Sequence, residues 1–222
     1  YFRMLFSMGI TLYTSRLILT ILGIDDFGIY NVIGGMVSMF LFLNTAMSSA
    51  TSRFLTFEIG KREKSEISKV FSVSLTTHLI IIAIIFVLCE SIGVWFLNSK
   101  MIIPEDRVYA ANIVLQTSIA ASLINIIQVP YRAIVVSYEK MDMYAYIEIF
   151  NVVSKLLIAI ALIYTTYDKL ITYSYLYLVT CVVVFLIYAV YANFRCVGAN
   201  FSPKLDKDIL KPMLTFTGWD FY

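Results

Sequence analysis

Charged side chains interrupt two long apolar stretches of this sequence. Arg16 stands in the stretch TLYTSRLILTILG, which ends at Gly23, and Lys155 stands in a similar stretch of the second half. A charge at the centre of a bilayer costs about 2.5–3.5 kcal/mol on insertion scales, so such residues usually face water or an opposite charge. In a wet cavity both side chains can bind an anion, and a guanidinium suits phosphate because it donates two parallel hydrogen bonds. Arg16 and Lys155 are therefore candidates for binding an anionic substrate.

A second pair of embedded charges has two interpretations. Arg132 and Glu148 lie at similar distances from the short polar segment 138–142, so they can face each other as a structural ion pair between two helices. Alternatively, Arg132 lines the path of a substrate. The embedded charges are three positive and one negative, which favours an anionic cargo. A proton or sodium site would require buried carboxylates instead.

Uncharged polar residues also occur within the apolar stretches. Their side chains can hydrogen-bond between helices, which is the simpler role, or they can contact sugar hydroxyls. The candidates for a polar cavity are Asn31, Asn112, Gln116 and Asn125. Pro130 removes a backbone hydrogen bond from its helix, and the resulting kink is either a hinge for alternating access or a fixed bend.

Metal and redox chemistry find no support in the sequence. The three cysteines lack the spacing of a metal or redox motif, and His78 is the only histidine. We therefore expect no metal site, no cofactor and no catalytic residue. The cysteines are interpreted as small apolar residues, and His78 as a hydrogen-bonded packing residue. The net charge of +2 gives no indication of nucleic-acid binding.

The elements that position these residues are expected to be membrane-spanning helices. Hydrophobic residues make up 60% of the 222, charged residues make up 14%, and the mean hydropathy is +0.82. A spanning helix needs about 20 mostly apolar residues, and the apolar runs here are too long for the strands of a barrel. The predicted spans are 4–22, 28–50, 70–89, 109–136, 143–165 and 171–194, with a seventh beginning near Met213. The sequence thus predicts an all-α, polytopic membrane protein.

The connectors between the predicted spans, among them 23–27 and 90–108, carry basic residues unequally. With the N-terminus in the cytoplasm, eleven basic residues fall on the inner side and three fall on the outer side. Cytoplasmic connectors carry the excess of Lys and Arg, so a cytoplasmic N-terminus is predicted. On this topology Arg16 and Lys155 both lie about a dozen residues from the inner end of a span, near mid-membrane.

The domain organisation follows from the same spans. We expect a six-helix transmembrane lobe over residues 1–194, a cytoplasmic linker over 195–211, and the start of a seventh helix over 212–222. The chain begins with Tyr1 and ends within an apolar run. We therefore expect it to be a piece of a longer protein, with a second lobe beyond its end.

Several motifs resemble those of polysaccharide flippases of the Wzx type, which belong to the multidrug/oligosaccharidyl-lipid/polysaccharide exporter superfamily. These motifs are LYTSRLILTILGIDDFGIYNVIGGMVSMFLFLN at 12–44, ATSRFLTFEIGK at 50–61, VWFLN at 94–98, and VPYRAIVVSYEKMDMYAYIEIFNVVSKLL at 129–157. The resemblance extends over nearly the whole chain. It implies a MATE-like fold of two six-helix lobes that face a central cavity, of which this chain supplies the first.

The resemblance also implies a substrate and a location. The substrate would be an undecaprenyl-diphosphate-linked oligosaccharide, moved across the bacterial inner membrane by alternating access for O-antigen or lipopolysaccharide synthesis. The expected partners are this substrate, membrane lipids and the polysaccharide assembly machinery. Arg16 matches an arginine that is common in the first span of such flippases, and Arg53 matches a basic residue at the inner end of the second span. Arg132 departs from the asparagine that usually follows Pro-Tyr.

Two other functions compete with this interpretation. A cation-coupled multidrug exporter of the same fold would place carboxylates in the membrane core, but the first predicted span contains none. A membrane-embedded polysaccharide ligase or polymerase would need large outer loops with catalytic basic residues. The outer connectors carry only Lys100, Arg107 and Lys169, and they contain no histidine. The sequence therefore favours a transporter over an enzyme.

Overall fold

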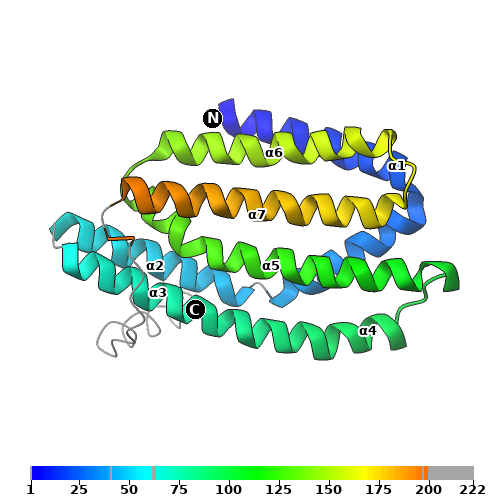
Figure 1. The fold of residues 1–222 in the computed structure, drawn as a ribbon, viewed down its shortest axis with the longest axis horizontal. Coiled ribbons are helices and arrows are strands. Elements are labelled where there is room, and N and C mark those ends of the chain that lie inside the picture. The colour runs from blue at the N-terminus through cyan, green and yellow to red at the C-terminus, as the bar shows by residue number, and fades with distance from the viewer. Residues whose placement is uncertain (1, 41, 62–63, 197, 200–222) are drawn as a thin grey trace. The chain divides into compact units, whose positions relative to one another are not determined.

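The computed structural model describes residues 2–40, 42–61, 64–196 and 198–199, which are almost entirely helical (Figure 1). The elements are α1 (Phe2–Phe40), α2 (Phe42–Lys61), α3 (Lys64–Leu88), the π-helix η1 (Cys89–Gly93), α4 (Val94–Ser99), the 3-10 helix η2 (Glu105–Arg107), α5 (Val108–Ser137), α6 (Met141–Ile163) and α7 (Lys169–Arg195). No strand occurs in the described ranges, and the expected all-α fold is confirmed.

Five described helical stretches are long and apolar enough to cross a membrane. They are Met4–Phe40, Glu66–Ser99, Glu105–Ser137, Met141–Ile163 and Lys169–Arg195. Large apolar side chains on these stretches are exposed, among them Leu12, Ile24 and Phe194. Such a surface suits lipid, because hydrocarbon tails solvate apolar side chains while the helix satisfies its own backbone polar groups. The chain is therefore a multi-pass membrane protein.

The first expected connector, 23–27, is a turn inside α1 and not a loop. Gly23 has φ 83° and ψ 174°, whereas the residues on both sides are helical. Glycine alone reaches this region of φ and ψ without strain. α1 thus consists of two arms, residues 2–22 and 24–40, which run in different directions (Figure 1). The expected span at 28–50 is correspondingly divided between the second arm of α1 and the start of α2.

The expected connector at 90–108 is also mostly helical. α3, η1 and α4 follow one another up to Ser99, and Glu90 lies in the π turn between the two α-helices. Only the segment from Lys100 to Pro104 is non-helical before η2 begins. The prediction of a connector from residue 90 was wrong, because the charge of Glu90 does not end a helix whose backbone hydrogen bonds continue.

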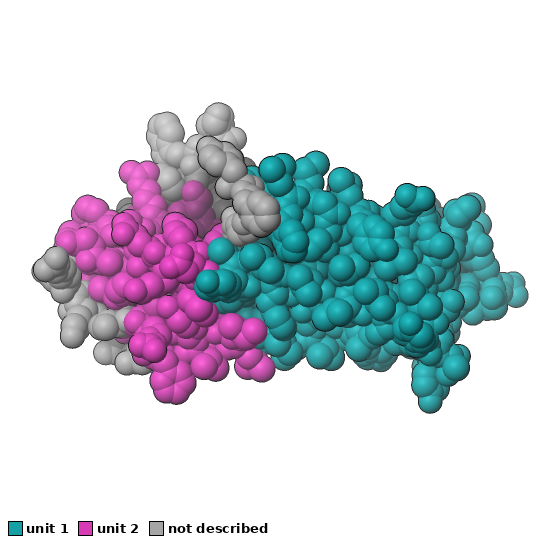
Figure 2. Space-filling model, turned by 90° about the horizontal axis from the view of Figure 1, so that it is seen from above, with its two compact units in different colours: residues 1–40, 86–122, 145–184 teal, residues 41–85, 123–144, 185–222 magenta. Residues whose placement is uncertain are grey.

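The chain divides into two compact units, which Figure 2 shows in different colours. Unit 1 contains residues 1–40, 86–122 and 145–184, and unit 2 contains residues 41–85, 123–144 and 185–222. The predicted linker 195–211 and the predicted seventh helix 212–222 lie almost wholly outside the described residues. Each unit is described separately below.

The core of unit 1 joins both arms of α1 to α6 and α7. Buried residues of the core are Ile18, Ile158, Ala159, Leu162 and Tyr173, and Phe27 and Tyr30 of the second arm pack against them. The rings of Tyr30 and Tyr173 meet edge to face, with centroids 4.9 Å apart. Such aromatic pairs contribute about 0.5–1.5 kcal/mol beyond the area they bury. The turn at Gly23 is thus held by contacts of both arms with the same cluster.

Unit 2 has a polar pair within its apolar core. The hydroxyls of Thr51 on α2 and Ser74 on α3 lie 2.8 Å apart, and both residues are buried. His78 Nδ1 lies 2.8 Å from the carbonyl oxygen of Ser74, one helical turn earlier. The interpretation of His78 as a hydrogen-bonded packing residue is confirmed. All three cysteines are buried and none of them forms a disulfide, which agrees with their interpretation as small apolar residues.

Candidate functional site

Unit 1 contains a cavity of about 150 Å³ with both polar and apolar lining residues, which we call the Lys155 cavity. It lies between the two arms of α1, α6 and α7. The lining residues are Thr11, Thr14, Ser15, Ile18, Phe27, Tyr30, Asn31, Val152, Lys155 and Tyr173.

The first arm of α1 contributes a stripe of hydroxyl groups to this cavity. Thr11, Thr14 and Ser15 are three and four residues apart, so the helix places them on one face. Thr11 Oγ1 donates a hydrogen bond to the carbonyl oxygen of Ser7 at 2.7 Å. Thr14 is only 5% exposed, and its hydroxyl has no hydrogen-bond partner among the described residues. A buried hydroxyl without a partner costs about 1–3 kcal/mol, so Thr14 is available to a ligand.

Lys155 of α6 supplies the positive charge of the cavity. Its side chain is half-buried, and Nζ lies 5.3 Å from the centroid of the Tyr177 ring. In this cation–π contact the ammonium group faces the ring on one side, and its other N–H groups can donate hydrogen bonds to other partners. On the opposite wall, Asn31 Nδ2 donates to the carbonyl oxygen of Phe27 at 2.8 Å. One amide hydrogen of Asn31 therefore remains for a ligand.

The electrostatics of the Lys155 cavity favour an anion. The cavity is lined by one cation, hydroxyls and an amide, and no carboxylate is among its lining residues. No carboxylate within the described ranges forms an ion pair with Lys155. A cation held at membrane depth without a paired charge attracts a negatively charged group. Among the described residues, no group of three or more His, Cys, Asp or Glu side chains is placed so that it could hold a metal ion.

The structure brings together only some of the predicted binding residues. Lys155 and Asn31 line the same cavity. Arg16 does not line it, and its side chain is exposed. At about 100° per residue, Arg16 lies about 200° around the helix from Thr14, which points into the cavity. Arg16 is thus not part of the Lys155 cavity, and a substrate site that combines Arg16 with Lys155 stays a prediction.

Four other predicted residues belong to unit 2. Arg53 on α2 and Asn125 on α5 are exposed, Arg132 is half-buried, and Pro130 is buried within α5. Glu148 is half-buried and belongs to unit 1. The Arg132–Glu148 ion pair and the place of these residues on a substrate path stay predictions.

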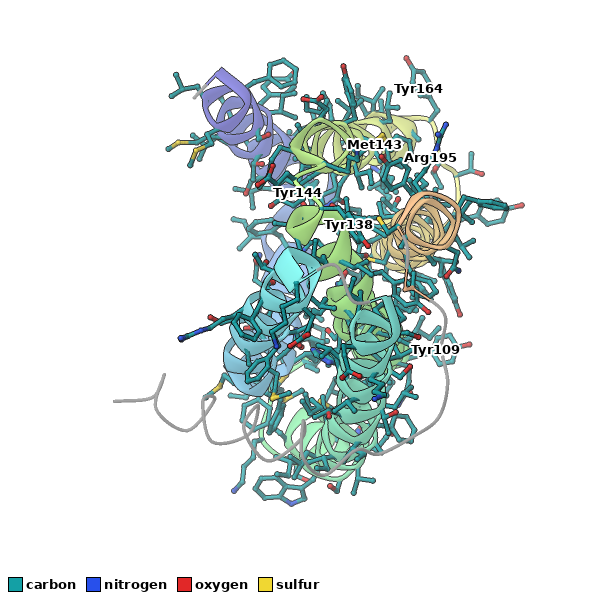
Figure 3. The ribbon with its side chains drawn as sticks, turned by 90° about the vertical axis from the view of Figure 1, so that its left-hand side faces the viewer. Tyr109, Tyr138, Met143, Tyr144, Tyr164 and Arg195 are labelled. Carbon is teal, nitrogen blue, oxygen red and sulfur yellow. The ribbon has the colours of Figure 1, made fainter. Side chains whose placement is uncertain are left out.

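Asn112 and Gln116 lie in a second region of unit 1, which we call the amide groove. This open groove is lined by Tyr109, Asn112, Ile113, Gln116, Thr117 and Tyr175. The side-chain amides of Asn98 and Asn112 donate to each other at 3.3 Å, and Gln116 Nε2 donates to Glu90 Oε2 at 3.1 Å. The predicted helix–helix role is confirmed for these two residues. Tyr109 at the end of the groove is exposed (Figure 3).

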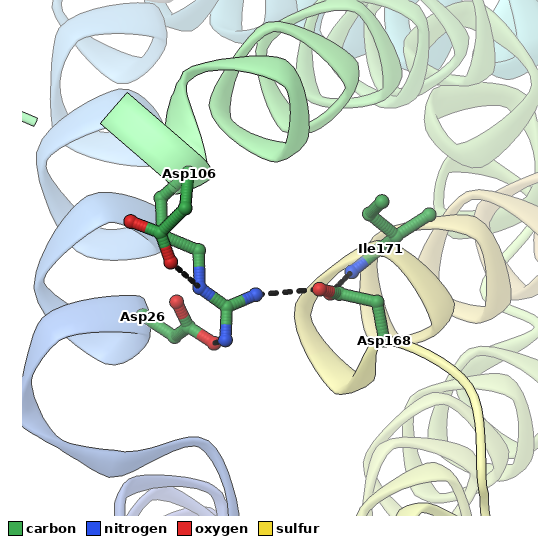
Figure 4. A network of polar contacts seen from close by, with 5 residues as sticks. Asp26, Asp106, Asp168 and Ile171 are labelled. Atoms are coloured by element: carbon green, nitrogen blue, oxygen red, sulfur yellow. Dashed lines mark hydrogen bonds and ion pairs between the residues drawn. The ribbon is translucent and has the colours of Figure 1, made fainter. Parts of the chain in front are cut away.

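A network of charges joins three elements at the Gly23 end of unit 1 (Figure 4). Arg107 Nη1 donates to Asp168 Oδ2 at 2.5 Å, and Arg107 Nη2 lies 3.3 Å from Asp26 Oδ2. Asp168 Oδ1 accepts a hydrogen bond from the backbone N–H of Ile171 at 3.1 Å, which caps the start of α7. We call Arg107, Asp26, Asp106 and Asp168 the Arg107 network. Of these four residues, only Arg107 was identified from the sequence, as a basic residue of an outer connector.

The sequence contains signals for several site residues that were not predicted. Thr14 and Ser15 are hydroxyl residues beside Arg16 in an apolar run, and Tyr30 precedes Asn31. A polar stripe at helical spacing within a span would have pointed to Thr11 and Thr14. No local signal identifies Tyr173, since its role depends on which face of α7 packs against α1.

Two of three comparisons place the chain among known proteins. The sequence matches the model of the MatE family over residues 2–161. The comparison with curated proteins found no match. The fold is similar to a crystal structure of a MATE in the bent conformation, with TM-score 0.76 and 18% identity, covering 97% of this chain and 49% of that one.

Two further solved structures have the same fold. One is the outward-facing conformation of a multidrug resistance MATE family transporter of the MOP superfamily, with TM-score 0.77, 18% identity, and coverage of 96% of this chain and 49% of that chain. The other is a MOP superfamily transporter from Pyrococcus furiosus, for which the reverse polarity of the binding pocket suggests a different function. Its TM-score is 0.77 at 18% identity, covering 97% of this chain and 49% of that one. The chain thus spans about half the length of these transporters.

Proposed function

Because the chain belongs to the MatE family, whose members are membrane transporters and not enzymes, we propose that it forms the first half of an exporter for an anionic, lipid-linked oligosaccharide. The cargo would carry an undecaprenyl-diphosphate group and would move across the bacterial inner membrane by alternating access. Surface polysaccharide synthesis would be the process served, with membrane lipids and the polysaccharide assembly machinery as partners.

The Lys155 cavity carries this proposal. Its charged group is a cation, its remaining polar groups are hydroxyls and an amide, and its lining includes no carboxylate. A site for a cationic drug, or for a coupling proton or sodium ion, would need the opposite charge. The diphosphate of a lipid-linked sugar is the part of the cargo that matches this chemistry.

The other predicted residues take proposed roles along the same path. Arg16, Arg53 and Arg132 would attract the diphosphate as it enters from the inner side or passes between the two halves of the transporter. The amides of Asn112, Gln116 and Asn125 would hold helices in register or contact sugar hydroxyls. Pro130 would act as the hinge of α5. A cytoplasmic N-terminus follows from the unequal distribution of basic residues.

The test uses the full-length protein in cells whose surface polysaccharide depends on it. Lys155→Met is expected to abolish surface polysaccharide while the protein remains folded and inserted, because the methionine keeps much of the volume but removes the charge. Lys169→Met is the matched control, since Lys169 is exposed and lies outside the cavity. Normal surface polysaccharide in the Lys155→Met strain would refute the proposed role of the cavity.

A multidrug exporter is the second candidate function. The observation that favours it is the similarity to a multidrug resistance MATE family transporter. An exporter of this kind would lower the cellular accumulation of a cationic dye such as ethidium, and the effect would depend on a sodium or proton gradient. Dye efflux together with unchanged surface polysaccharide would establish this function in place of the proposed one.

A further inference from the structure

The size of the Lys155 cavity limits which part of a substrate it can hold. A volume of about 150 Å³ corresponds to roughly five water molecules, or to one benzene-sized group. A sugar unit with its ring of hydroxyls is larger, and an isoprenoid chain is larger still. Lys155 is half-buried and Asn31 is exposed, so a substrate bound here can extend out of the cavity.

The donors of the cavity come from three directions. Thr14 Oγ1 enters from the first arm of α1 and has no hydrogen-bond partner in the described part of the chain. Asn31 enters from the second arm with one amide hydrogen remaining, and Lys155 enters from α6. A tetrahedral anion offers acceptor oxygens in several directions, whereas a planar carboxylate offers two in one plane. Three donors around one small volume therefore match a tetrahedral anion best.

We infer that the Lys155 cavity binds a single phosphoryl group through Lys155, Thr14 and Asn31, while the remainder of the molecule lies outside. This inference deepens the proposed function, because it names the part of the lipid-linked substrate that the cavity holds. The same chemistry would bind free inorganic phosphate. Thr14 distinguishes this site from a general positive patch, because no residue that the structure describes hydrogen-bonds to its buried hydroxyl.

The experiment measures the shift in thermal unfolding temperature of the full-length protein in nanodiscs of neutral phosphatidylcholine. Inorganic phosphate and a prenyl monophosphate are the two probes, with chloride and acetate as controls at the same ionic strength. Both phosphate probes are expected to raise the unfolding temperature, and chloride and acetate are not. A shift with inorganic phosphate alone would identify a free anion as the ligand, and a larger shift with the prenyl phosphate would identify the lipid headgroup.

Matched variants locate the bound group. Thr14→Val, which keeps the shape but removes the hydroxyl, should weaken phosphate binding roughly tenfold, whereas Thr14→Ser should restore it. Lys155→Met should weaken binding on the order of a hundredfold, Lys155→Arg should retain most of it, and Lys169→Met should leave it unchanged. The unfolding temperature of each variant without ligand shows whether it is folded.

The outcomes separate this inference from the proposed function. Equal stabilisation by chloride and phosphate, or phosphate binding that survives both Thr14→Val and Lys155→Met, would overturn the phosphoryl site. In that case loss of polysaccharide export in the Lys155→Met strain would still support the proposed function. The converse outcome is also informative. If phosphate binding in nanodiscs depends on Thr14 and Lys155 while the Lys155→Met strain exports polysaccharide normally, the site is supported and its proposed role in export is refuted.

Discussion

Gly23 allows α1 to reverse direction within a single residue. Its φ of 83° with ψ of 174° lies in a region that L-amino acids with a Cβ atom scarcely populate. Apart from Gly23, its two chain neighbours and the nearby backbone of the helix, no described atom lies within 4 Å of the position that a Cβ would occupy, so the restriction comes from the local backbone and not from crowding. Both walls of the Lys155 cavity depend on this turn, because Thr14 precedes it and Asn31 follows it.

We predict that Gly23→Ala lowers the free energy of unfolding by about 1–3 kcal/mol, the usual cost of a side chain in a glycine-only conformation. Gly28→Ala is the matched control, because Gly28 is helical and also has open space around it. It should be neutral, or stabilising by about 0.5–1 kcal/mol. Equilibrium unfolding in mixed micelles measures the free energy of unfolding of both variants. Equal effects of the two substitutions would contradict the assigned strain.

At the scale of elements, the Arg107 network ties α1 to the starts of α5 and α7. Asp26 is only 6% exposed and depends on Arg107 for a partner, and Asp168 both pairs with Arg107 and caps α7. Removing one partner of a buried pair leaves a charge without compensation, which costs more than the pair itself contributes. The network therefore fixes one end of unit 1.

We predict that Arg107→Met destabilises the protein by about 1–3 kcal/mol, because the Asp26 carboxylate then stays buried without its partner. Adding Asp26→Asn should recover part of this loss, since it removes the uncompensated charge. The four corners of this double-mutant cycle are compared by unfolding in mixed micelles. Strictly additive losses would show that the two residues do not interact.

The amide groove provides a second test between elements. Asn98 of α4 and Asn112 of α5 donate to each other, and hydrogen bonds between membrane helices contribute about 0.6 kcal/mol on average. Alanine at both positions should therefore show a coupling energy of about 0.5–1 kcal/mol in a double-mutant cycle. A coupling near zero would mean that the amides exchange their mutual bond for water at no cost.

Hydropathy was sufficient to predict the helical class and most of the spans, because a helix that crosses lipid must be apolar over a fixed length. It could not predict the turn at Gly23, since helical residues on both sides replace the expected loop. It also could not distinguish Lys155 from Arg16. Both are basic residues at similar predicted depth, and only the packing of each helix decides which face points into a cavity.

At the scale of the whole molecule, the topology can be tested by accessibility. Ile102 lies in the non-helical segment before η2 and is fully exposed, and Glu139 lies in the turn between α5 and α6. With a cytoplasmic N-terminus, Ile102→Cys should react with a membrane-impermeant maleimide in intact cells. Glu139→Cys should react only after the membrane is permeabilised. The native cysteines are buried and should contribute little background.

Reversed labelling of the two cysteine variants would place the N-terminus outside and would overturn the orientation derived from the basic residues. The parent protein without either substitution is the control for labelling of the native thiols. Protein level and insertion are compared in the same cells, so a variant that fails to accumulate is recognised before its labelling is interpreted.

The π turn η1 sets the rotational phase of everything between Val94 and Ser99. A π turn holds one more residue than an α-helical turn, so deleting one residue there would restore regular helix and leave the rotation of α4 nearly unchanged. Asn98 would then still face Asn112, and the Trp95 indole would stay beside the ammonium group of Lys100. Deleting a residue between Val94 and Asn98 would instead rotate Asn98 by about 100° away from Asn112, so the π turn is the place where this helix tolerates a change in length.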